Sequence, residues 1–544
     1  MHNRLRAGLI GGVALLTLVT AACGSGGGGA GSPSASGKTG GTISVRGCTP
    51  QNPLIAGNTS ETCGGNVITA ITSELVHYNS DTAAPELDLA QSIDTTDNIH
   101  FTVKLKQGQK FDDGTEVKAR NFVDAWNTVA YGPNGYQGSY FFEPIKGYAD
   151  VQCADAKCTT PPASKQMSGL QVKDDYTFTI ETTSPVSNLL VRLGYSAFAP
   201  MPDAFLNNIT SDSFGKMPVG NGPFKVTAND ATQIVLEKNP NYTGAWPAHV
   251  DKITYRIYND TSTAFTDVVA NNLDFTDVIP TDQLAGDAYK KTVGDRSLIK
   301  PVGIFQWVTF SPNDNQLKNV DLRKALSMAV DRQSITQTVF NNTRTPADSW
   351  VSPVVDGYKA GVCGDACKYD AAAAKALYDK AGGYKGTLLL SVNGDGGHQQ
   401  WAQAACNSMK NALGVDCQVN TTPDFKTLRN KIQSGELTGM FRGGWQMDYP
   451  SIEDFLTPIY AKGAASNDAK YDNPAFDAKL AEAAAAPDLA KANALYQEAE
   501  AMLATDMPTM PLWFSSQAVA WSTKVTDVKV TAFGTLDYSA ISVK

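Results

Sequence analysis

The sequence is poor in histidine and lacks the common catalytic motifs. Five of its 544 residues are His, and the body of the chain has no C-x-x-C, H-E-x-x-H or G-x-S-x-G motif and no phosphate loop. Zinc sites, metalloproteases, serine hydrolases and many nucleotide-binding sites are built on these patterns. The sequence therefore predicts no metal site and no cofactor, and it gives no support to an enzyme.

A basic excess is also absent. The chain carries 45 Lys and Arg against 54 Asp and Glu, which gives a formal net charge of -9. Binding to nucleic acid needs a basic face, so we expect no nucleic-acid partner. Apolar residues make up 42% of the chain, as in globular proteins. Because single cores stop growing at about 250–300 residues, a chain of this length is expected to form at least two lobes.

A long apolar run occurs at the N-terminus and nowhere else. Arg4 and Arg6 precede the apolar residues 7–22. A run of this length is shorter than the roughly 20 residues that span a bilayer, and it is typical of the core of a signal peptide. We therefore expect residues 1–22 to be a signal peptide and the mature protein to be exported.

The apolar run ends in Thr20-Ala21-Ala22-Cys23. Small residues before a Cys resemble the lipobox of bacterial lipoproteins, although an aliphatic residue is usual where Thr20 stands. The resemblance implies that Cys23 is lipidated and anchors the protein to the outer face of the cell membrane. Residues 23–41 are rich in Gly and Ser and predict a flexible tether. The alternative is a secretory signal cut at the A-x-A-like site, which leaves Cys23 as a free thiol.

The remaining eight cysteines fall in close pairs along the chain. An even number in an exported protein predicts four short-range disulfides. The pairs are Cys48 with Cys63, Cys153 with Cys158, Cys363 with Cys367, and Cys406 with Cys417.

Strand and helix patterns alternate in the body of the chain. Apolar residues alternate with polar ones at 101–105, 176–180 and 253–257, which predicts half-buried strands. Apolar stripes at helical spacing cover 322–330, with Asp321 as the expected N-cap, and 489–503, with Pro508 as the stop. The pattern predicts a mixed α/β protein.

Several segments resemble, in order, the peptide/nickel-type (family 5) solute-binding proteins of ABC importers, and most of all their oligopeptide-binding lipoproteins. Together they cover nearly the whole mature chain. They are PELDLAQSIDTTDNIHFTVKLKQGQKFDDGTEVKARNFVDAW at 85–126, PVGNGPFKV at 218–226, LEKNPNYTGAWPAHVDKITYRI at 236–257, LKNVDLRKALSMAVDRQSI at 317–335, KYDAAAAKALYDKAGGY at 368–384, GWQMDYPSIEDFL at 444–456, and YDNPAFDAKL through MPTMPLWF at 471–514.

The resemblance implies an α/β, two-lobed periplasmic-binding-protein-like (Venus-flytrap) fold. Lobe one is expected at 42–301, with an inserted subdomain at about 76–194. Lobe two is expected at 302–514, and residues 515–544 return to lobe one. The two crossings between lobes would form a hinge, and the ligand would lie in the cleft.

In the oligopeptide-binding branch, the Asp of a G-W-x-x-D-Y stretch holds the terminal ammonium of the peptide. That residue is Asp448 here, and its alternative role is a turn or cap before Pro450. An anion is a suitable partner because an ammonium loses its water in a closed cleft. In this family an acidic residue or Asn and then a Pro often follow the D-Y shortly afterwards, whereas this chain continues with residues 450–452 (PSI), so the shape of the pocket is open.

The same branch places an Arg at position 442 and a His at position 398 near the peptide carboxylate. Arg442 could instead form an ordinary surface ion pair, and His398 could be a solvated loop residue. Trp445 and Phe425 are candidate walls for side-chain pockets, or plain core residues. Tyr140 is expected to face the ligand from lobe one.

The predicted function is capture of peptides outside the membrane and delivery to ABC permease subunits that work with separate ATPase subunits. The receptor is expected to be a monomer. The alternatives are a receptor of the same class for a nickel chelate, a sugar oligomer or an antibiotic-like compound, a peptide-sensing receptor, and a secreted hydrolase.

Overall fold

The structure is a computed structural model, and it describes residues 38–544 except 51, 60, 61, 156, 157, 211, 259, 395, 396, 424 and 465. The predicted signal peptide, the lipidation site Cys23 and most of the predicted tether lie outside the described residues. Residues 37–544 form one compact unit.

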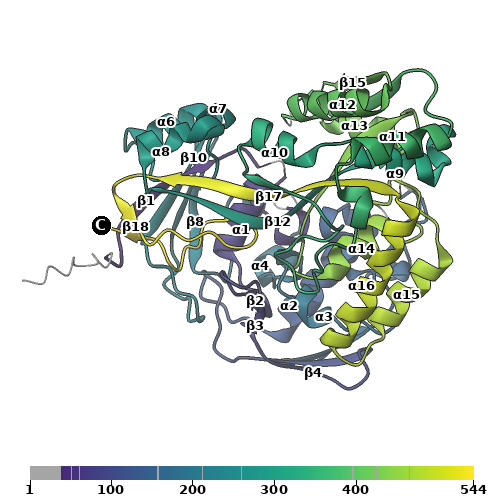
Figure 1. The fold of residues 1–544 in the computed structure, drawn as a ribbon. Coiled ribbons are helices and arrows are strands. Elements are labelled where there is room, and N and C mark those ends of the chain that lie inside the picture. The colour runs from purple at the N-terminus through teal and green to yellow at the C-terminus, as the bar shows by residue number, and fades with distance from the viewer. Residues whose placement is uncertain are drawn as a thin grey trace, which may run out of the picture. The chain divides into compact units, whose positions relative to one another are not determined.

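One mixed sheet of eleven strands runs through this unit (Figure 1). Ten of its strands follow one path, and β13 (Arg344–Pro346) pairs with β17 beside it. In spatial order the ten are β15 (Cys417–Thr422), β14 (Leu388–Asn393), β16 (Met440–Gln446), β12 (Ser297–Phe310), β17 (Thr509–Trp521), β11 (Phe275–Thr276), β1 (Thr42–Gly47), β10 (Lys252–Ile257), β9 (Gln233–Lys238) and β8 (Phe224–Asn229).

Three smaller sheets accompany it. A four-stranded antiparallel sheet has the order β4 (Ala90–Thr95), β5 (His100–Leu105), β7 (Thr177–Glu181) and β6 (Leu170–Asp174). Two short pairs are formed by β2 (Val76–Tyr78) with β3 (Pro85–Leu87) and by β18 (Val525–Thr526) with β19 (Ser542–Val543).

Two large hydrophobic cores divide the unit into two lobes. The first core draws on residues 43–275 and on the C-terminal residues 519–541, together with Tyr449. The second draws on residues 305–514, together with Ala83 and Ala532. We call the parts organised around them the first and the second lobe.

Helices cover both lobes. Those before β12 are α1 (Thr62–Ile71), α2 (Ala119–Ala130), α3 (Leu189–Arg192), α4 (Asp203–Leu206), α5 (Asp212–Lys216), α6 (Thr261–Val269), α7 (Thr281–Leu284) and α8 (Ala288–Val293). Those after β12 are α9 (Val320–Met328), α10 (Arg332–Phe340), α11 (Ala371–Lys380), α12 (Gln399–Leu413), α13 (Phe425–Gln433), α14 (Ile452–Tyr460), α15 (Pro474–Ala484) and α16 (Leu489–Asp506).

Two long antiparallel strands, β12 and β17, connect the lobes, and Figure 1 shows them side by side across the molecule. Their pairing is irregular at two points, between Pro301 and Phe305 and between Gln306 and Trp307, and the larger shift is the first. Pro301 pairs with Ser516, and the next pair is Phe305 with Phe514, so β12 has extra residues at this point. An irregularity of this kind bends a strand and weakens the ladder locally. It lies where the sequence places the boundary between lobes.

The predicted strands and helices are present, with one correction. Apolar residues of β5, β7 and β10 are buried in alternation, as predicted. The stripe at 489–503 forms α16, which ends at Met507 in a left-handed conformation just before Pro508. Asp321 is not the N-cap of α9. Asn319 has that role, because its side chain accepts the backbone N–H groups of Asp321 and Leu322.

All eight cysteines of the folded body form disulfides, in the four pairs named above. Each closes a loop of 4 to 15 residues. Loops this short constrain the unfolded chain only modestly, so these bonds serve mainly to hold local segments in place.

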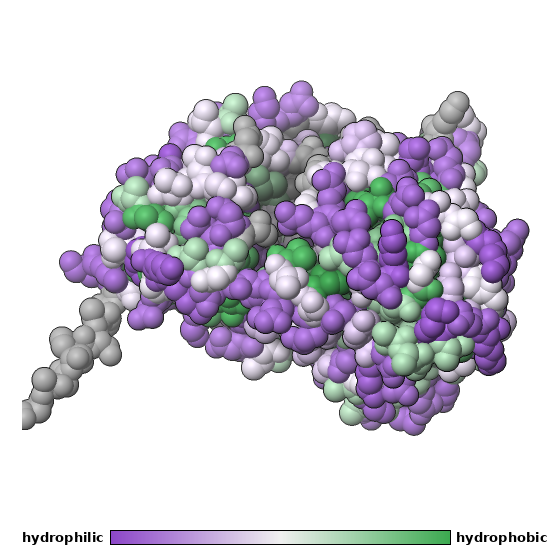
Figure 2. Space-filling view, turned by 45° about the horizontal axis from the view of Figure 1, so that its top comes forward, coloured by the Kyte–Doolittle hydropathy of each residue, from purple (hydrophilic) through white to green (hydrophobic). Residues whose placement is uncertain are grey.

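The surface is mainly polar on the face that Figure 2 shows, with hydrophobic side chains in small groups. Within the part of the chain that the structure describes, no helix has both the length and the apolar character to cross a bilayer.

Candidate ligand-binding site

The predicted site residues lie at one edge of the main sheet. Strands β14, β15 and β16 are parallel, so their carboxyl ends meet at the same edge. In open α/β sheets, ligands bind outside the carboxyl ends of parallel strands. Arg442 lies within β16, Phe425 follows β15, and Asp448 lies two residues beyond the end of β16.

Asp448 is half-buried and is held from both lobes. Its backbone N–H donates to Asp454 Oδ2 over 3.0 Å. The hydroxyl of Tyr140, which belongs to the first lobe, donates to Asp448 Oδ2 over 3.2 Å. Tyr140, which the resemblance places on the ligand side of lobe one, therefore contacts the predicted ammonium ligand directly.

A second carboxylate, Asp454, stands behind Asp448. It is 1% exposed and lies in the first turn of α14. Besides the N–H of Asp448, its Oδ2 accepts the indole N–H of Trp445 over 3.1 Å. Trp445 is half-buried and packs against the second core. Asp454 thus fixes both the loop that carries Asp448 and the ring beside it.

A third acid, Glu453, connects these two acids to the first lobe. We call the region around Asp448, Asp454 and Glu453 the acidic pocket. It is 2% exposed and forms an ion pair of 2.9 Å with Arg192. It also accepts hydrogen bonds from Tyr449 over 2.8 Å and from Asn188 over 3.0 Å. The charge of Glu453 is therefore balanced locally by Arg192, whereas Asp448 and Asp454 form no ion pair within the described residues.

Burial and the neighbouring acids raise the pKa values of Asp448 and Asp454. Burial raises the pKa of Asp448 to about 7, and the charge of Glu453 adds to the effect. Burial raises the pKa of Asp454 well above its usual range, and the Asp448 and Glu453 charges act in the same direction. Both pKa shifts arise because a buried negative charge beside other acids is unfavourable. A cation brought into contact with Asp448 would relieve this cost.

Two tyrosines of the first lobe, Tyr140 and Tyr195, lie close to Asp448. Burial and the charge of Asp448 raise the pKa of Tyr140 and of Tyr195 far above the usual range. The ring of Phe141 stacks on Tyr140 with centroids 4.2 Å apart and lies 4.5 Å from that of Tyr195. Tyr140 remains 43% exposed. Aromatic faces beside carboxylates are a favourable setting for an ammonium group.

Arg442 lies elsewhere along the same edge. Its Nη1 donates to Asn393 Oδ1 at the end of β14 over 3.3 Å. Its guanidinium lies 5.5 Å from the ring centroid of Phe425, which is 48% exposed. Phe425 is therefore not a core residue, and it provides an aromatic surface beside a cation at the carboxyl ends of the strands.

His398 directly precedes α12. Its Nδ1 accepts the indole N–H of the buried Trp401 over 3.0 Å, which fixes the ring orientation and leaves Nε2 as the protonated nitrogen of a neutral ring. The half-buried His398 is thus held by the helix that it starts. A solvated loop histidine would not have this hydrogen bond to a buried indole.

The structure brings Asp448, Trp445 and Tyr140 into one cluster, and Arg442 and Phe425 into another. Sequence reasoning missed Asp454, Glu453, Arg192 and Tyr195. The adjacent acids at 453 and 454, five and six residues after a candidate ammonium ligand, were an available signal. Tyr195 and Arg192 have no local pattern that distinguishes them.

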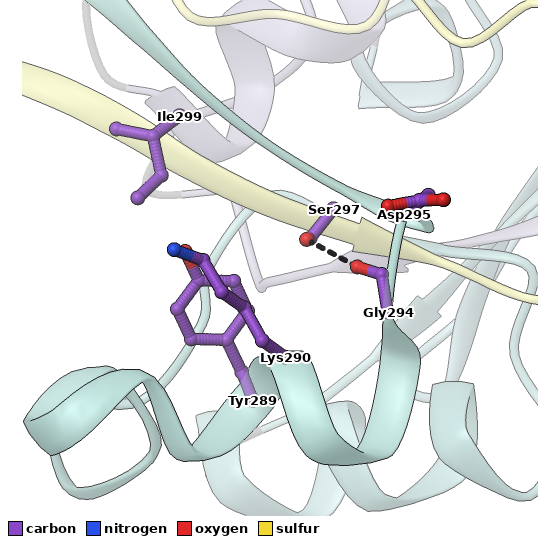
Figure 3. Close-up of a pocket in the computed structure, with 6 residues that line it drawn as sticks. All are labelled: Tyr289, Lys290, Gly294, Asp295, Ser297 and Ile299. Atoms are coloured by element: carbon purple, nitrogen blue, oxygen red, sulfur yellow. Dashed lines mark hydrogen bonds between the residues drawn. The ribbon is translucent and has the colours of Figure 1, made fainter.

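A different hollow of about 470 Å³ lies in the first lobe (Figure 3). Its lining includes Lys290 and Tyr289 of α8, and the start of β12. Lys290 is paired with Asp287 over 2.9 Å, and Ser297 donates to the carbonyl of Gly294. These groups satisfy one another and do not converge on the hollow, so it is a weaker candidate than the acidic pocket.

Comparison with known proteins identifies the family. The profile of the bacterial extracellular solute-binding proteins, family 5, matches residues 84–467. The oligopeptide-binding protein OppA of Bacillus subtilis is 28% identical over 94% of this chain and 94% of its own length. The probable deoxycholate-binding periplasmic protein YgiS of Escherichia coli is 27% identical over 76% of this chain and 77% of its own.

Solved structures agree on the fold. Haemophilus influenzae OppA, in complex with the peptide RPPGFSPFR, superposes with a TM-score of 0.74 at 22% identity and covers 93% of this chain and 100% of its own. This likeness shows the two-lobed periplasmic-binding-protein fold. With the profile match over most of the chain, it establishes that the protein belongs to the family 5 bacterial extracellular solute-binding proteins.

Proposed function

We propose that this solute-binding protein captures peptides outside the membrane and delivers them to an ABC importer. The observation that carries the proposal is the acidic pocket of Asp448 and Asp454, faced by tyrosines, on the same sheet edge as Arg442. A peptide has a cationic amino end and an anionic carboxyl end. Oligopeptide-binding relatives support the same class of solute.

The binding energy would come mainly from the two ends and the main chain. A terminal ammonium would contact Asp448 and exchange hydration for charge-assisted hydrogen bonds. The peptide would lie extended in the cleft, as an added strand does, so side chains would matter less. Arg442 would receive a carboxylate, with Phe425 and Trp445 as apolar walls, and His398 would lie on the carboxylate side.

Closure of the two lobes would complete the site. We place lobe one at 42–301 and 515–544, with an inserted subdomain at about 76–194, and lobe two at 302–514. The interrupted pairing of β12 and β17 supports a hinge at these boundaries. The hydrogen bond from Tyr140 to Asp448 supports the idea that both lobes contact the same end of the ligand, which favours the closed state.

The setting of the receptor completes the proposal. Cys23 would carry a lipid anchor after removal of residues 1–22, and residues 23–41 would tether a monomeric receptor to the outer face of the membrane. Transport would depend on separate permease and ATPase subunits, and the chain itself would catalyse no reaction.

The direct test is binding of alanine peptides of three to six residues, measured by native mass spectrometry and calorimetry. We expect at least one length to bind, and binding to weaken strongly when its amine is acetylated. The Asp448→Asn variant should lose this preference for a free amine. Asp365→Asn, which removes an exposed acid of the same lobe, is the matched control and should keep it. Failure of the wild type to bind any of these peptides would contradict the proposal.

A steroid acid is the second candidate, because one relative carries the name of a deoxycholate-binding protein. Such a ligand has an anionic end and no ammonium group. It would use Arg442 and leave Asp448 unpaired. Binding of deoxycholate that is insensitive to Asp448→Asn, in the absence of peptide binding, would favour this candidate.

A further inference from the structure

A second arginine of the second lobe, Arg344, is preorganised without an anionic partner. It is the first residue of β13, and its guanidinium lies 4.0 Å from the ring centroid of Phe340. Its Nη1 donates to Gln306 Oε1 over 2.7 Å. No carboxylate of the described residues lies within ion-pair distance of Arg344. An arginine held in this way is positioned by neutral groups and keeps its full charge.

Gln306 fixes the orientation of Arg344. Its Oε1 accepts a second hydrogen bond, from the indole N–H of Trp513, over 3.0 Å. Two donors meet at this atom, so it must be the oxygen, and the amide cannot be flipped. The amide nitrogen of Gln306, a residue 5% exposed, then has no acceptor among the described residues. Arg344 and Gln306 together therefore present hydrogen-bond donors that no acceptor among the described residues satisfies.

Arg442 lies on the same face of the sheet. Gln306 of β12 is directly opposite Gly444 of β16, and Arg442 lies two residues before Gly444 on the same strand. Because side chains alternate along a strand, residues two apart share a face. A Cβ atom at position 444 would lie 3.0 Å from Arg442 Nη2, so the guanidinium of Arg442 reaches over this glycine toward Gln306.

The two arginines affect each other electrostatically. Burial and, to a smaller extent, the charge of Arg442 lower the pKa of Arg344 to about 10. A cation in a partly buried site beside a second cation is stabilised when an anion contacts it. A carboxylate fits because its two oxygens can accept the parallel N–H groups of a guanidinium fork.

We propose that Arg344, held in place by Gln306, is a second carboxylate ligand beside Arg442 in the second lobe. This inference rests on the proposed peptide receptor for the identity of the ligand. The carboxylate could be the C-terminus of the peptide or an acidic side chain near it. Arg344, which is half-buried and so still reachable by a ligand, makes the contact. Gln306 is a positioning residue, because its own amide is buried.

The first experiment compares alanine peptides that carry a free carboxylate or a C-terminal amide, by calorimetry, in the wild type and in Arg344→Gln. We expect amidation to weaken binding to the wild type about tenfold or more, as the loss of a charge-assisted bond does. In Arg344→Gln the difference between the two peptides should shrink to about twofold. Lys410→Gln, which removes an exposed charge of the same lobe, is the control and should retain the difference.

A second pair of peptides separates the two sources of the carboxylate. Amidated peptides that end in Glu or in Gln carry a carboxylate on the side chain or none at all. If Arg344 binds a side-chain carboxylate, Arg344→Gln should remove the preference for Glu over Gln and leave the effect of C-terminal amidation unchanged. Retention of both preferences in Arg344→Gln would overturn the inference.

Gln306→Glu gives an independent readout with little change in shape. The new carboxylate would form an ion pair with Arg344 and neutralise its charge. The variant should therefore gain thermal stability and, like Arg344→Gln, lose the preference for a peptide carboxylate. A merely structural role of Gln306 would not link these two effects. A variant that gains no stability and keeps the preference would contradict the proposal.

The subsite can also be tested without a peptide. Sodium glutarate should raise the melting temperature of the wild type more than sodium chloride at equal ionic strength, and Arg344→Gln should lose this difference. If the wild type binds no peptide but shows the glutarate effect, the proposed function fails and the carboxylate site stands. If peptides bind but Arg344→Gln alters neither their preferences nor the glutarate effect, this inference alone fails.

Discussion

The acidic pocket around Asp448 and the basic region around Arg344 and Arg442 share one lobe but are built in opposite ways. Asp448 is held by a backbone contact to a second acid, Asp454, and by a tyrosine from the other lobe. Arg344 is held by a neutral amide and by an aromatic ring of its own lobe. In neither region does the key residue, Asp448 or Arg344, have a charged partner of opposite sign among the described residues.

Because of this difference, the two regions would select a ligand in different ways. Opposite charges left uncompensated in one lobe suit a molecule with a cation at one end and an anion at the other. The acidic pocket includes contacts from both lobes, so its occupant is linked to closure. The described contacts of the basic region all come from the second lobe. We therefore expect it to orient the ligand in both the open and the closed arrangement of the lobes.

The largest effect should come from Asp448→Asn. Removing the charge that meets the ammonium should weaken binding of free-amine peptides about 100-fold, the equivalent of about 2.7 kcal/mol. Calorimetry with free and N-acetylated peptides measures the loss. Equal weakening of both peptides would show that Asp448 acts on the pocket and not on the amine.

The same variant has a stability control. Because the pKa of Asp448 in the folded protein is raised to about 7, its ionisation destabilises the fold at higher pH. Stability from the protonated form is present below the ordinary pKa and is lost as the pH rises through about 7. Asp448→Asn should therefore melt higher than the wild type at pH 8, and the two should converge near pH 4.

The pH dependence of binding should be the next largest effect. An ammonium binds the ionised form of Asp448, so below pH 7 the free protein must release a proton to bind. Affinity for free-amine peptides should therefore fall about tenfold for each pH unit below 7, as long as the bound carboxylate remains ionised. Titrations between pH 8 and pH 5 measure the slope. N-acetylated peptides, as the control, should show a nearly flat profile.

A smaller effect is expected at the other end of the guest. Arg442→Gln should weaken peptides that have a free carboxylate about tenfold, with little change for amidated peptides. The effect is smaller than that of Asp448→Asn because Arg344 remains as a second cation nearby. The double variant with Arg344→Gln should lose less than the two single variants combined, because each single variant already removes most of the contribution of the shared carboxylate. Strict additivity of the two would argue against a shared anion.

The smallest effect should come from Asp454→Asn. Burial raises the pKa of Asp454 well above its usual range, which favours the neutral form that Asp454→Asn imitates. An amide oxygen can still accept the N–H groups of Trp445 and Asp448. We expect a change in affinity below about threefold, measured with the same peptides. A loss as large as that of Asp448→Asn would show that both acids are ionised and share the cation.

The sequence predicted the architecture better than the site. Alternating strands such as β5 and the helix α16 follow from local periodicity, and the ordered family segments implied the two lobes. The error at Asp321 has a local cause. Two polar residues near the start of α9 can both cap a helix, and the backbone of Asn319, not the residue type, decides between them.

At the site, residues in a recognisable motif could be predicted and their partners could not. Asp448 and Trp445 belong to a G-W-x-x-D-Y stretch, whereas Asp454 is connected to them only through the fold of the loop. Arg344 and Gln306 are 38 residues apart and meet because β13 and β12 both pair with β17. Neither residue type is unusual where it stands, so no sequence pattern points to the pair.

In this mechanism, one lobe holds the two opposite charges of a zwitterionic ligand. The most direct measurement is the affinity of the wild type for one peptide in four forms, with its amine and its carboxylate each free or blocked. We expect either block to weaken binding tenfold or more and the doubly blocked peptide to bind weakest of all. A doubly blocked peptide that binds as tightly as the free one would show that neither charge is recognised.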